Sequence, residues 1–317
     1  MFISGKETIE FLKNCDNIYI FTHQSPDGDC IGSGFALHEF FRSTGKRSAV
    51  LCSDKFPDKF SFITDTENNA DFTPETFITV DVADRKLLGK YEELYGDKIN
   101  LCIDHHVSNK DYAERTFLRA DDAAACQVLY RLFCAMSFEL SDYSAACLYT
   151  GMATDTGCFR YENTGAETHE IIGEIMRNHK LNYAGINRKM FEIKTRARMT
   201  LESNMCNIME EYLDGKLVIV AVTLDMIKEM GIVSGELEGI ASLTIQLEGA
   251  EVGVFMKERE PNVFKCSFRS ADKVNVSDIC GTFGGGGHVK ASGCIIEGTD
   301  LADVKNKIVE AVGKVLK

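Results

Sequence analysis

The sequence predicts an α/β protein with an N-terminal parallel-sheet domain and a smaller C-terminal α/β domain. Over the first half of the 317 residues, short apolar runs alternate with segments of helical spacing, an order typical of parallel sheets. Acidic residues and histidines directly follow several of these runs. Because ligands of such sheets bind outside the carboxyl ends of the strands, the polar residues are expected to converge there.

Each expected element follows from hydrophobic period and turn residues. The N-terminal elements are strands at 17–22, 48–52, 77–80 and 99–103, and helices at 32–44, 85–94, 123–136, 141–153 and 168–178. A single long helix is expected at 186–213. After it come strands at 217–223, 250–257, 263–270 and 294–296, a helix at 236–247 and a final helix capped by Asp300.

The chain is too long for one ordinary core, so we predict three parts. A catalytic domain occupies 1–185, the long helix 186–213 joins the domains, and a substrate-binding domain occupies 214–317.

Composition excludes several classes of protein. With 44% hydrophobic and 26% charged residues the chain is an ordinary globular one, and its net charge of −13 argues against binding long nucleic acid, duplex included. No apolar run reaches membrane-span length and the N-terminus lacks a signal-peptide pattern, so we expect a cytoplasmic protein with no membrane partner. The 12 cysteines include no Cys-x-x-Cys, and many interrupt apolar segments as small core residues do.

The segment Leu101–His106 is the most informative stretch. Its apolar run ends in Asp104, His105 and His106, residue types suited to metal binding or acid–base chemistry. By itself this pattern equally fits two histidines in a solvated loop.

Similar clusters follow the other strands. His23, Asp27 and Asp29 surround a Pro-Asp-Gly turn, although both carboxylates also suit turn and helix-cap positions. Asp81 follows the third strand, and Asp155 lies at a helix end, where it also suits a cap. Four carboxylates and two imidazoles without thiolate can hold a pair of divalent cations, and manganese suits them better than structural zinc.

Four consecutive glycines, Gly284, Gly285, Gly286 and Gly287, precede His288 in the second domain. Such a run is either a flexible hinge or a loop whose backbone approaches a ligand. Because it lies within a domain and is followed by His, Lys and Ser, we favour a loop that holds phosphate. Arg269, at a strand end, either supplies a cation to the same pocket or is simply exposed.

Taken together, these motifs resemble the DHH phosphoesterase family, which includes the exonuclease RecJ. The resemblance covers essentially the whole chain, and length and second domain are most similar to the small bacterial NrnA branch of nanoRNases and 3′-phosphoadenosine-5′-phosphate phosphatases. The motifs are His23-x-x-Pro-Asp27-x-Asp29-x-x-Gly32-Ser33, Asp81, Asp104-His105-His106 and Asp155, followed by Arg269-Ser270 and Gly284 to His288.

The resemblance implies a role for each position. One Mn²⁺ would be held by His23, Asp27 and Asp81, and a second by Asp29, Asp81, His105 and Asp155. Asp104 would orient a ligand histidine, and His106 would lie beside the scissile phosphate. Arg269, Ser270, Gly284 to Gly287 and His288 would hold the rest of the substrate.

The implied activity is hydrolysis of very short single-stranded RNA, such as the dinucleotide pApA, to nucleoside monophosphates by a hydroxide activated by two metals. Removal of phosphate from 3′-phosphoadenosine-5′-phosphate is a further expected reaction, and relatives suggest a homodimer. The alternatives are an inorganic pyrophosphatase or exopolyphosphatase, and a nucleotide-binding sensor without turnover.

Overall fold

The computed structural model describes residues 1–317 except 65–66, 233–236, 238 and 317. The chain forms two compact units, Met1–Ile193 and Lys194–Lys317, each of which has its own sheet. The predicted α/β class is confirmed. Among the described residues, no helix has the length and apolar character needed to cross a bilayer.

The first unit is built on a five-stranded sheet in the order β2-β1-β3-β4-β5, with every neighbouring pair parallel. All carboxyl ends of the strands therefore meet at one edge of this sheet. The strands are β1 (Ile18–Phe21), β2 (Ser48–Leu51), β3 (Thr76–Val80), β4 (Leu101–Asp104) and β5 (Arg115–Leu118).

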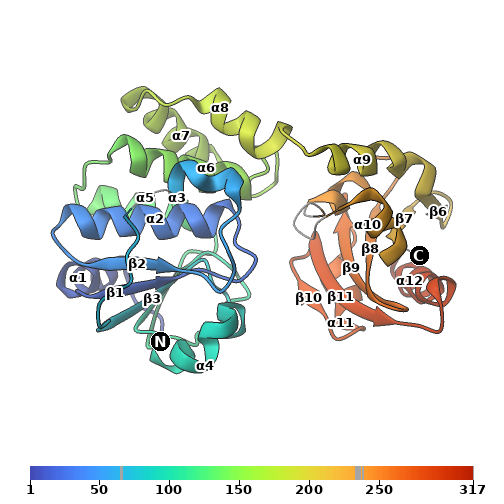
Figure 1. Cartoon of the computed structure of the whole chain (residues 1–317), viewed down its shortest axis with the longest axis horizontal. Coiled ribbons are helices and arrows are strands. Elements are labelled where there is room, and N and C mark those ends of the chain that lie inside the picture. The colour runs from blue at the N-terminus through green and yellow to red at the C-terminus, as the bar shows by residue number, and fades with distance from the viewer. Residues whose placement is uncertain (65–66, 233–236, 238, 317) are drawn as a thin grey trace. The chain divides into compact units, whose positions relative to one another are not determined.

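Helices α2 and α5 pack against one face of the sheet, and α6 and α7 pack on the outer side of these helices in the same apolar core (Figure 1). The α-helices of the unit are α1 (Gly5–Asn14), α2 (Gly28–Ser43), α3 (Ser61–Thr64), α4 (Glu92–Tyr95), α5 (Ala125–Ala135), α6 (Asp142–Asp155), α7 (Ala166–Asn178) and α8 (Tyr183–Asn187). Short 3₁₀ turns occupy Asp58–Phe60, Arg85–Tyr91 and Gly96–Lys98.

Successive side chains of each strand enter two different apolar layers, as the period of two along a strand requires. Ile18 and Ile20 of β1 are buried against the layer of long helices. Tyr19 and Phe21 face the other way, into an aromatic cluster that includes Phe77. The sheet is thus buried on both faces, which explains its nearly continuous apolar strands.

Three predictions for this unit need correction. The helix expected at 85–94 is a 3₁₀ segment, Arg85–Tyr91, followed by the short α4, because Gly89 has a φ of 57° and interrupts the helical backbone within the 3₁₀ segment. The helix expected at 32–44 already begins at Gly28. Strand β5 was not predicted, since at this sheet edge Thr116 alone of its residues is buried and no apolar run marks it.

The second unit is a six-stranded mixed sheet in the order β10-β11-β9-β8-β7-β6, in which β7 and β8 pair in parallel and the other neighbours are antiparallel. Helices α11 and α12 cover one face, and α9 packs on the other. Its elements are α9 (Arg196–Ile208), β6 (Met209–Tyr212), β7 (Leu217–Val222), α10 (Leu224–Met230), β8 (Val252–Glu260), β9 (Val263–Ser270), α11 (Val276–Gly281), β10 (Gly286–Gly287), β11 (Ala291–Glu297) and α12 (Leu301–Val315), whose N-cap is Asp300 as predicted.

The prediction of one long helix at 186–213 is wrong. A π-helical segment, Arg188–Glu192, continues α8, and Ile193 then adopts an extended backbone conformation. Thr195 starts a new helix because its side chain caps the amide of Arg198 at 3.0 Å. Leu201 of this new helix is fully buried on the second sheet, so α9 belongs to the core of that unit.

The helix expected at 236–247 lies partly outside the described residues. Within the described part only the 3₁₀ turn Ile240–Leu243 forms. Gly239 precedes this turn with a left-handed φ of 70°, which is incompatible with a continuous helix.

Candidate metal centre

The polar residues predicted to converge do meet at the carboxyl edge of the parallel sheet. His23 follows β1, Asp81 follows β3, and β4 ends on Asp104 with His105 and His106 directly after it. Potential ligand atoms come within 4.8 Å of one another in three overlapping groups: His23, Asp27, Cys30 and Asp81; Asp81, His105 and His106; and Asp29, His105 and Asp155.

The start of α2 positions two of the carboxylates for different tasks. Asp27 is the N-cap, and its Oδ1 accepts the amides of Asp29 and Cys30 at 3.0 and 3.1 Å. Asp29 is fully buried and accepts the amides of Ala125 and Cys126 at 2.6 and 2.9 Å. It therefore caps α5, whose own N-cap residue is an alanine without a capping side chain.

Close packing of α2 on α6 brings Asp155 to this site. A Cβ added to Gly28 would lie 2.3 Å from Thr154 Oγ1, and one added to Gly151 would lie 2.7 Å from Asp29 Oδ1. Because only glycine permits these approaches, the end of α6 can lie against the start of α2.

Asp81 is the central carboxylate and belongs to two of the groups. Only 2% of it is exposed, its φ is +59°, and its amide donates to the Ile103 carbonyl at 3.0 Å. This left-handed conformation turns the chain sharply at the end of β3. Asp81 Oδ1 is buried without a hydrogen-bond partner of ordinary geometry.

Backbone carbonyls orient two of the histidines. His105 Nδ1 lies 3.1 Å from the Asp122 carbonyl, and His23 Nδ1 lies 2.8 Å from the Gln24 carbonyl. Since a carbonyl only accepts, each Nδ1 donates its hydrogen and the neutral ring keeps a lone pair on Nε2. His105 Nε2 points at Asp155 and Asp81, at 3.3 and 3.4 Å.

His106 is oriented differently from the other two rings. Its Nδ1 lies 2.8 Å from Asp104 Oδ1, an oxygen that also accepts the amides of His105 and His106. Asp104 Oδ2 accepts from the Asn109 side chain at 2.6 Å. Asp104 is thus fully buried and saturated by hydrogen bonds, which fits a residue that holds its neighbours in place.

The carboxylates strongly perturb the ionisation of the cluster. Burial lowers the pKa of His105, but contacts with Asp155 and Asp81 outweigh it and raise this pKa to about 12. Burial likewise opposes the charge on His106, yet the hydrogen bond to Asp104 prevails and its pKa rises to about 9. Burial, which outweighs the contact with His105, raises the pKa of Asp155 to about 6.

Two further carboxylates respond in opposite directions. Burial and then the charges of Asp81 and Asp155 raise the pKa of Asp29 well above its usual value. Burial would also raise the pKa of Asp81, but its contacts with His105 and His23 lower it instead. So much negative charge in one buried place requires bound protons or cations.

The residues fit divalent cations by their chemistry. Carboxylate oxygens and imidazole Nε2 atoms are suitable ligands, and the carbonyl contacts of Nδ1 are the usual support of metal-binding histidines. Buried Asp81 Oδ1 and His105 Nε2 lie 3.4 Å apart, and neither makes a hydrogen bond of ordinary geometry. The centre therefore offers a cation ligand atoms that the protein leaves unsatisfied.

Sequence reasoning missed the support of His105 by Asp122. The Asp122 carboxylate accepts from Arg131 Nε and Nη2 at 3.1 and 2.9 Å, and Arg131 also pairs with Glu167 at 2.5 Å. This network fixes the loop whose carbonyl orients the histidine. The contact to His105 is made by a backbone atom, so the identity of residue 122 gave no signal.

Cys30 is a second omission, since no ligand role was predicted for it. It is fully buried, yet its sulfur belongs to the group of His23, Asp27 and Asp81. Its position one residue after Asp29 in the motif was the available signal.

The residues predicted to bind substrate lie on β9 and β10, which flank β11 in the sheet of the second unit, and in the chain directly before and after β10. Arg269 is half-buried near the end of β9, and its Nη1 donates to the Phe268 carbonyl at 2.8 Å. The buried Ser270 contacts Glu251 at 3.4 Å, and His288 is exposed.

The backbone of the glycine run is hydrogen-bonded mainly to other residues of the second unit. The amides of Gly284 and Gly285 donate to the carbonyls of Gly281 and Cys280, and Gly286–Gly287 pairs with β11 as β10. The amide of His288 donates to the Ala291 carbonyl at 2.9 Å. Of the four glycines, Gly284 and Gly286 have open space where a side chain would project, but only Gly284 of these two has a positive φ, 73°.

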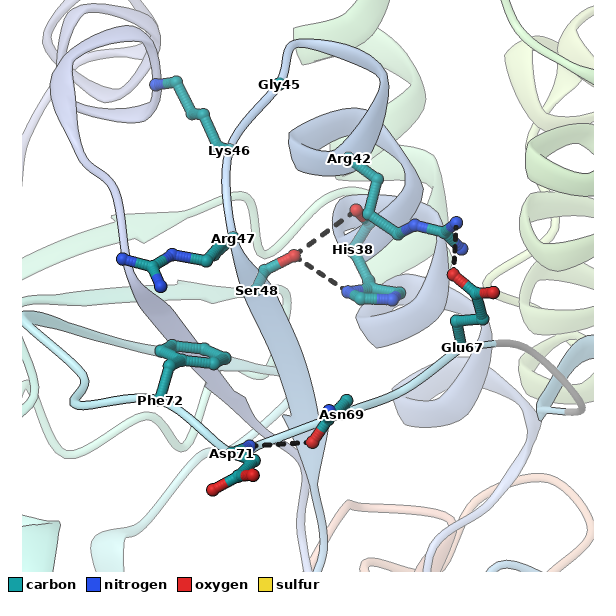
Figure 2. Close-up of a pocket in the computed structure, with 10 residues that line it drawn as sticks. All are labelled: His38, Arg42, Gly45, Lys46, Arg47, Ser48, Glu67, Asn69, Asp71 and Phe72. Atoms are coloured by element: carbon teal, nitrogen blue, oxygen red, sulfur yellow. Dashed lines mark hydrogen bonds and ion pairs between the residues drawn. The ribbon is translucent and has the colours of Figure 1, made fainter.

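A surface cavity of about 430 Å³ lies elsewhere in the first unit, beside the end of α2 and the start of β2 (Figure 2). Figure 2 shows His38 beside Ser48, where their Nδ1 and Oγ atoms are 2.8 Å apart, and the ion pair of Arg42 with Glu67. The cavity adjoins the amino end of β2 and contains none of the predicted site residues. The candidate metal centre is therefore separate from this cavity.

Two domain families match the chain. Residues 17–152 match the DHH family, N-terminal domain, and residues 214–317 match the DHHA1 domain. The chain thus contains a DHH-family N-terminal domain followed by a DHHA1 domain. The family expected from the motifs is confirmed, and with it the expectation of a hydrolase.

Curated relatives align with the DHH chain over most of their length. The bifunctional oligoribonuclease and PAP phosphatase NrnA of Thermus thermophilus is 29% identical over 302 residues, covering 93% of this chain and 89% of the relative. The protein of the same name from Bacillus subtilis is 23% identical over 302 residues, covering 94% and 95%.

Solved structures support the fold. An exopolyphosphatase-related protein from Bacteroides fragilis has a TM-score of 0.89 at 24% identity, covering 98% of this chain and 95% of that one. RecJ from Thermus thermophilus in complex with Mn²⁺ has a TM-score of 0.57 at 12% identity, covering 98% of this chain and 55% of RecJ. At these identities the likeness concerns the fold alone.

Proposed function

We propose that this chain is a Mn²⁺-dependent phosphoesterase that hydrolyses very short RNA, such as dinucleotides, to nucleoside monophosphates and also removes the 3′-phosphate of 3′-phosphoadenosine-5′-phosphate. The observation that carries the proposal is the buried Asp81, shared by two ligand groups and left with an unsatisfied oxygen. The names of the curated relatives support the substrate class.

In this proposal two cations share Asp81. His23 and Asp27 complete one position, and Asp29, His105 and Asp155 complete the other. Bound there, divalent cations supply Lewis-acid stabilisation of phosphoryl charge and lower the pKa of a water molecule.

The chain's own residues orient these ligands and the proton carrier. The carbonyls of Gln24 and Asp122 fix the rings of His23 and His105, so that each presents Nε2. Asp104 Oδ1 accepts from His106 Nδ1, which leaves the other edge of this ring to face the scissile phosphate and protonate the leaving ribose oxygen.

The second unit would hold the remainder of the substrate. Arg269 supplies positive charge, and Gly286 leaves space for close approach of a phosphate. The other predicted contacts are Ser270, Gly284, Gly285, Gly287 and His288. A short ligand requires few basic residues, in keeping with the net charge of −13.

The activity is tested by measuring turnover of pApA, longer RNA, 3′-phosphoadenosine-5′-phosphate, pyrophosphate and polyphosphate with Mn²⁺ and with chelator. We expect Mn²⁺-dependent hydrolysis of the dinucleotide and the bisphosphate nucleotide, which chelator abolishes. Faster phosphate release from pyrophosphate or polyphosphate would instead identify a pyrophosphatase or exopolyphosphatase. Nucleotide binding without turnover would identify a sensor.

The roles of the two neighbouring histidines are separated by His105→Ala and His106→Ala. We expect His105→Ala to lose bound Mn²⁺ because it removes a ligand atom. His106→Ala should keep the metal but lose turnover. Equal metal loss in both variants, measured by metal analysis after dialysis, contradicts this assignment.

A further inference from the structure

The group around His23 contains a sulfur atom that the predicted ligand set lacks. Cys30 is fully buried in the first turn of α2. Its Sγ and one potential ligand atom each of His23, Asp27 and Asp81 all lie within 4.8 Å of one another. Ligands on opposite sides of one cation are separated by the sum of two bond lengths, which is about 4.4 Å for one sulfur and one nitrogen or oxygen ligand of zinc. One ion can therefore contact all four residues after small side-chain adjustments.

Helix capping fixes the position of this cysteine. The Asp27 carboxylate accepts the amide of Cys30 at 3.1 Å, and the Cys30 sulfur lies 3.7 Å from the Asp27 carbonyl. The same turn that presents one predicted ligand thus holds the thiol beside it.

Cys126 provides a comparison within the same fold. It is also fully buried, and its sulfur lies 3.7 Å from the Asp29 carbonyl. However, it fills the space left by Gly32 and Gly151 between α2 and α6, and it belongs to none of the candidate metal groups among the described residues. Burial near an acidic residue is therefore not what distinguishes Cys30.

Asp81 contributes a second buried ligand atom to the group around Cys30. Only 2% of this residue is exposed, and its Oδ1, which has no hydrogen-bond partner of ordinary geometry, faces His105 Nε2 at 3.4 Å in the neighbouring group. Its Oδ2 lies 3.7 Å from His23 Nε2, the atom that faces the group. The carboxylate is thus placed to bind an ion between itself, the imidazole and the thiol.

We infer that Cys30 supplies a sulfur ligand to the cation held by His23, Asp27 and Asp81. When the sulfur–metal bond forms, the thiol proton leaves to solvent. A thiolate favours Zn²⁺ and Co²⁺ over Mn²⁺, so this position would select softer cations than an oxygen and nitrogen set does. The inference rests on the metal centre of the proposed function and changes its metal preference.

Cobalt absorption tests this assignment without a turnover assay. Metal-free full-length protein is titrated with Co²⁺, and we expect a near-ultraviolet sulfur-to-cobalt charge-transfer band. Cys30→Ala and Cys30→Ser should still bind Co²⁺ but lose this band, whereas Cys126→Ala should keep it. A wild-type cobalt complex without the band, or a band that persists in both Cys30 variants, overturns the inference.

Competition between Zn²⁺ and Mn²⁺ gives a second readout. Loss of a supporting group of a metal ligand typically costs about 10–100-fold in affinity, so Cys30→Ala should lower the Zn²⁺ to Mn²⁺ affinity ratio by at least about tenfold. An unchanged ratio overturns the inference. If the protein hydrolyses pApA but its cobalt complex lacks the band, the sulfur ligand is refuted and the proposed function stands. If the band is present but the protein hydrolyses none of the proposed substrates, the proposed function is refuted and the sulfur ligand stands.

Discussion

The metal centre of the first unit and the glycine loop of the second differ in how they use their polar groups. In the centre, buried Asp81 Oδ1 and His105 Nε2 lack ordinary hydrogen bonds and face other charged groups. In the loop, the amides of Gly284, Gly285 and His288 already donate to carbonyls of the same unit. The first region is therefore incomplete without a ligand, whereas much of the second is explained by the packing of its own sheet.

The comparison predicts the largest effect for Asp81→Asn. Asparagine tolerates the left-handed backbone at this position, so the variant removes the charge while keeping the turn. We expect loss of turnover well beyond the roughly 100-fold typical for an outer partner of a metal ligand. Steady-state rates on pApA measure this loss. Near-normal turnover would show that the shared carboxylate is dispensable.

A smaller effect is expected from Asp122→Asn, which weakens the pairing with Arg131 and loosens the loop that orients His105. Such outer partners typically contribute about 10–100-fold to metal affinity. Mn²⁺ titration calorimetry measures the change. The neighbouring, exposed Asp121→Asn is the matched control and should bind normally. Equal affinity in both variants contradicts a positioning role.

The metal centre should also bind protons in competition with cations, because its histidines lie against carboxylates. The raised pKa of His105, about 12, means that the metal-free ring is protonated at neutral pH. A cation must displace this proton, so Mn²⁺ affinity should rise with pH, by at least about tenfold per unit. A pH-independent affinity in the wild type rules out this competition.

The smallest effects are expected in the glycine loop. A Cβ at Gly285 would lie 2.2 Å from the Gly293 carbonyl oxygen, whereas one at Gly286 would meet nothing within 4 Å. Gly285→Ala should lower the free energy of unfolding by about 1–3 kcal/mol, as overpacking does. Gly286→Ala should change it by less than about 0.5 kcal/mol.

Denaturant unfolding and KM measurements together separate packing from binding in this loop. A raised KM in the stable Gly286→Ala variant supports contact with substrate. An unchanged KM, with destabilisation confined to Gly285→Ala, assigns the glycines to packing alone.

The convergence of the strand-end residues was predictable because parallel topology alone brings them to one edge. His23, Asp81 and Asp104 each follow a short apolar run, and the runs pair in parallel as expected. The family motifs also identified Asp29, but not its capping of α5, since that contact joins residues 96 positions apart. Hydrophobic periodicity predicts single helices and strands, but it does not predict which side chain of one element contacts the backbone of another.

Other features were hidden for different physical reasons. The Asp122 contact to His105 uses a backbone carbonyl, which every residue possesses. The helical pattern at 186–213 continued past Ile193, where the extended backbone ends one segment and Thr195 caps the next. Cys30 was given no ligand role, because a buried cysteine in an apolar helix is not distinguished by sequence from one that lies beside potential metal ligands.

The most direct measurement of the central claim is the number of Mn²⁺ ions bound per chain. Equilibrium dialysis of the full-length wild type at saturating Mn²⁺ should give two ions, which share the Asp81 carboxylate. Asp81→Asn, dialysed in parallel, should retain neither at the same free concentration. A wild type that binds no Mn²⁺, or an Asp81→Asn variant that still binds two, contradicts the account.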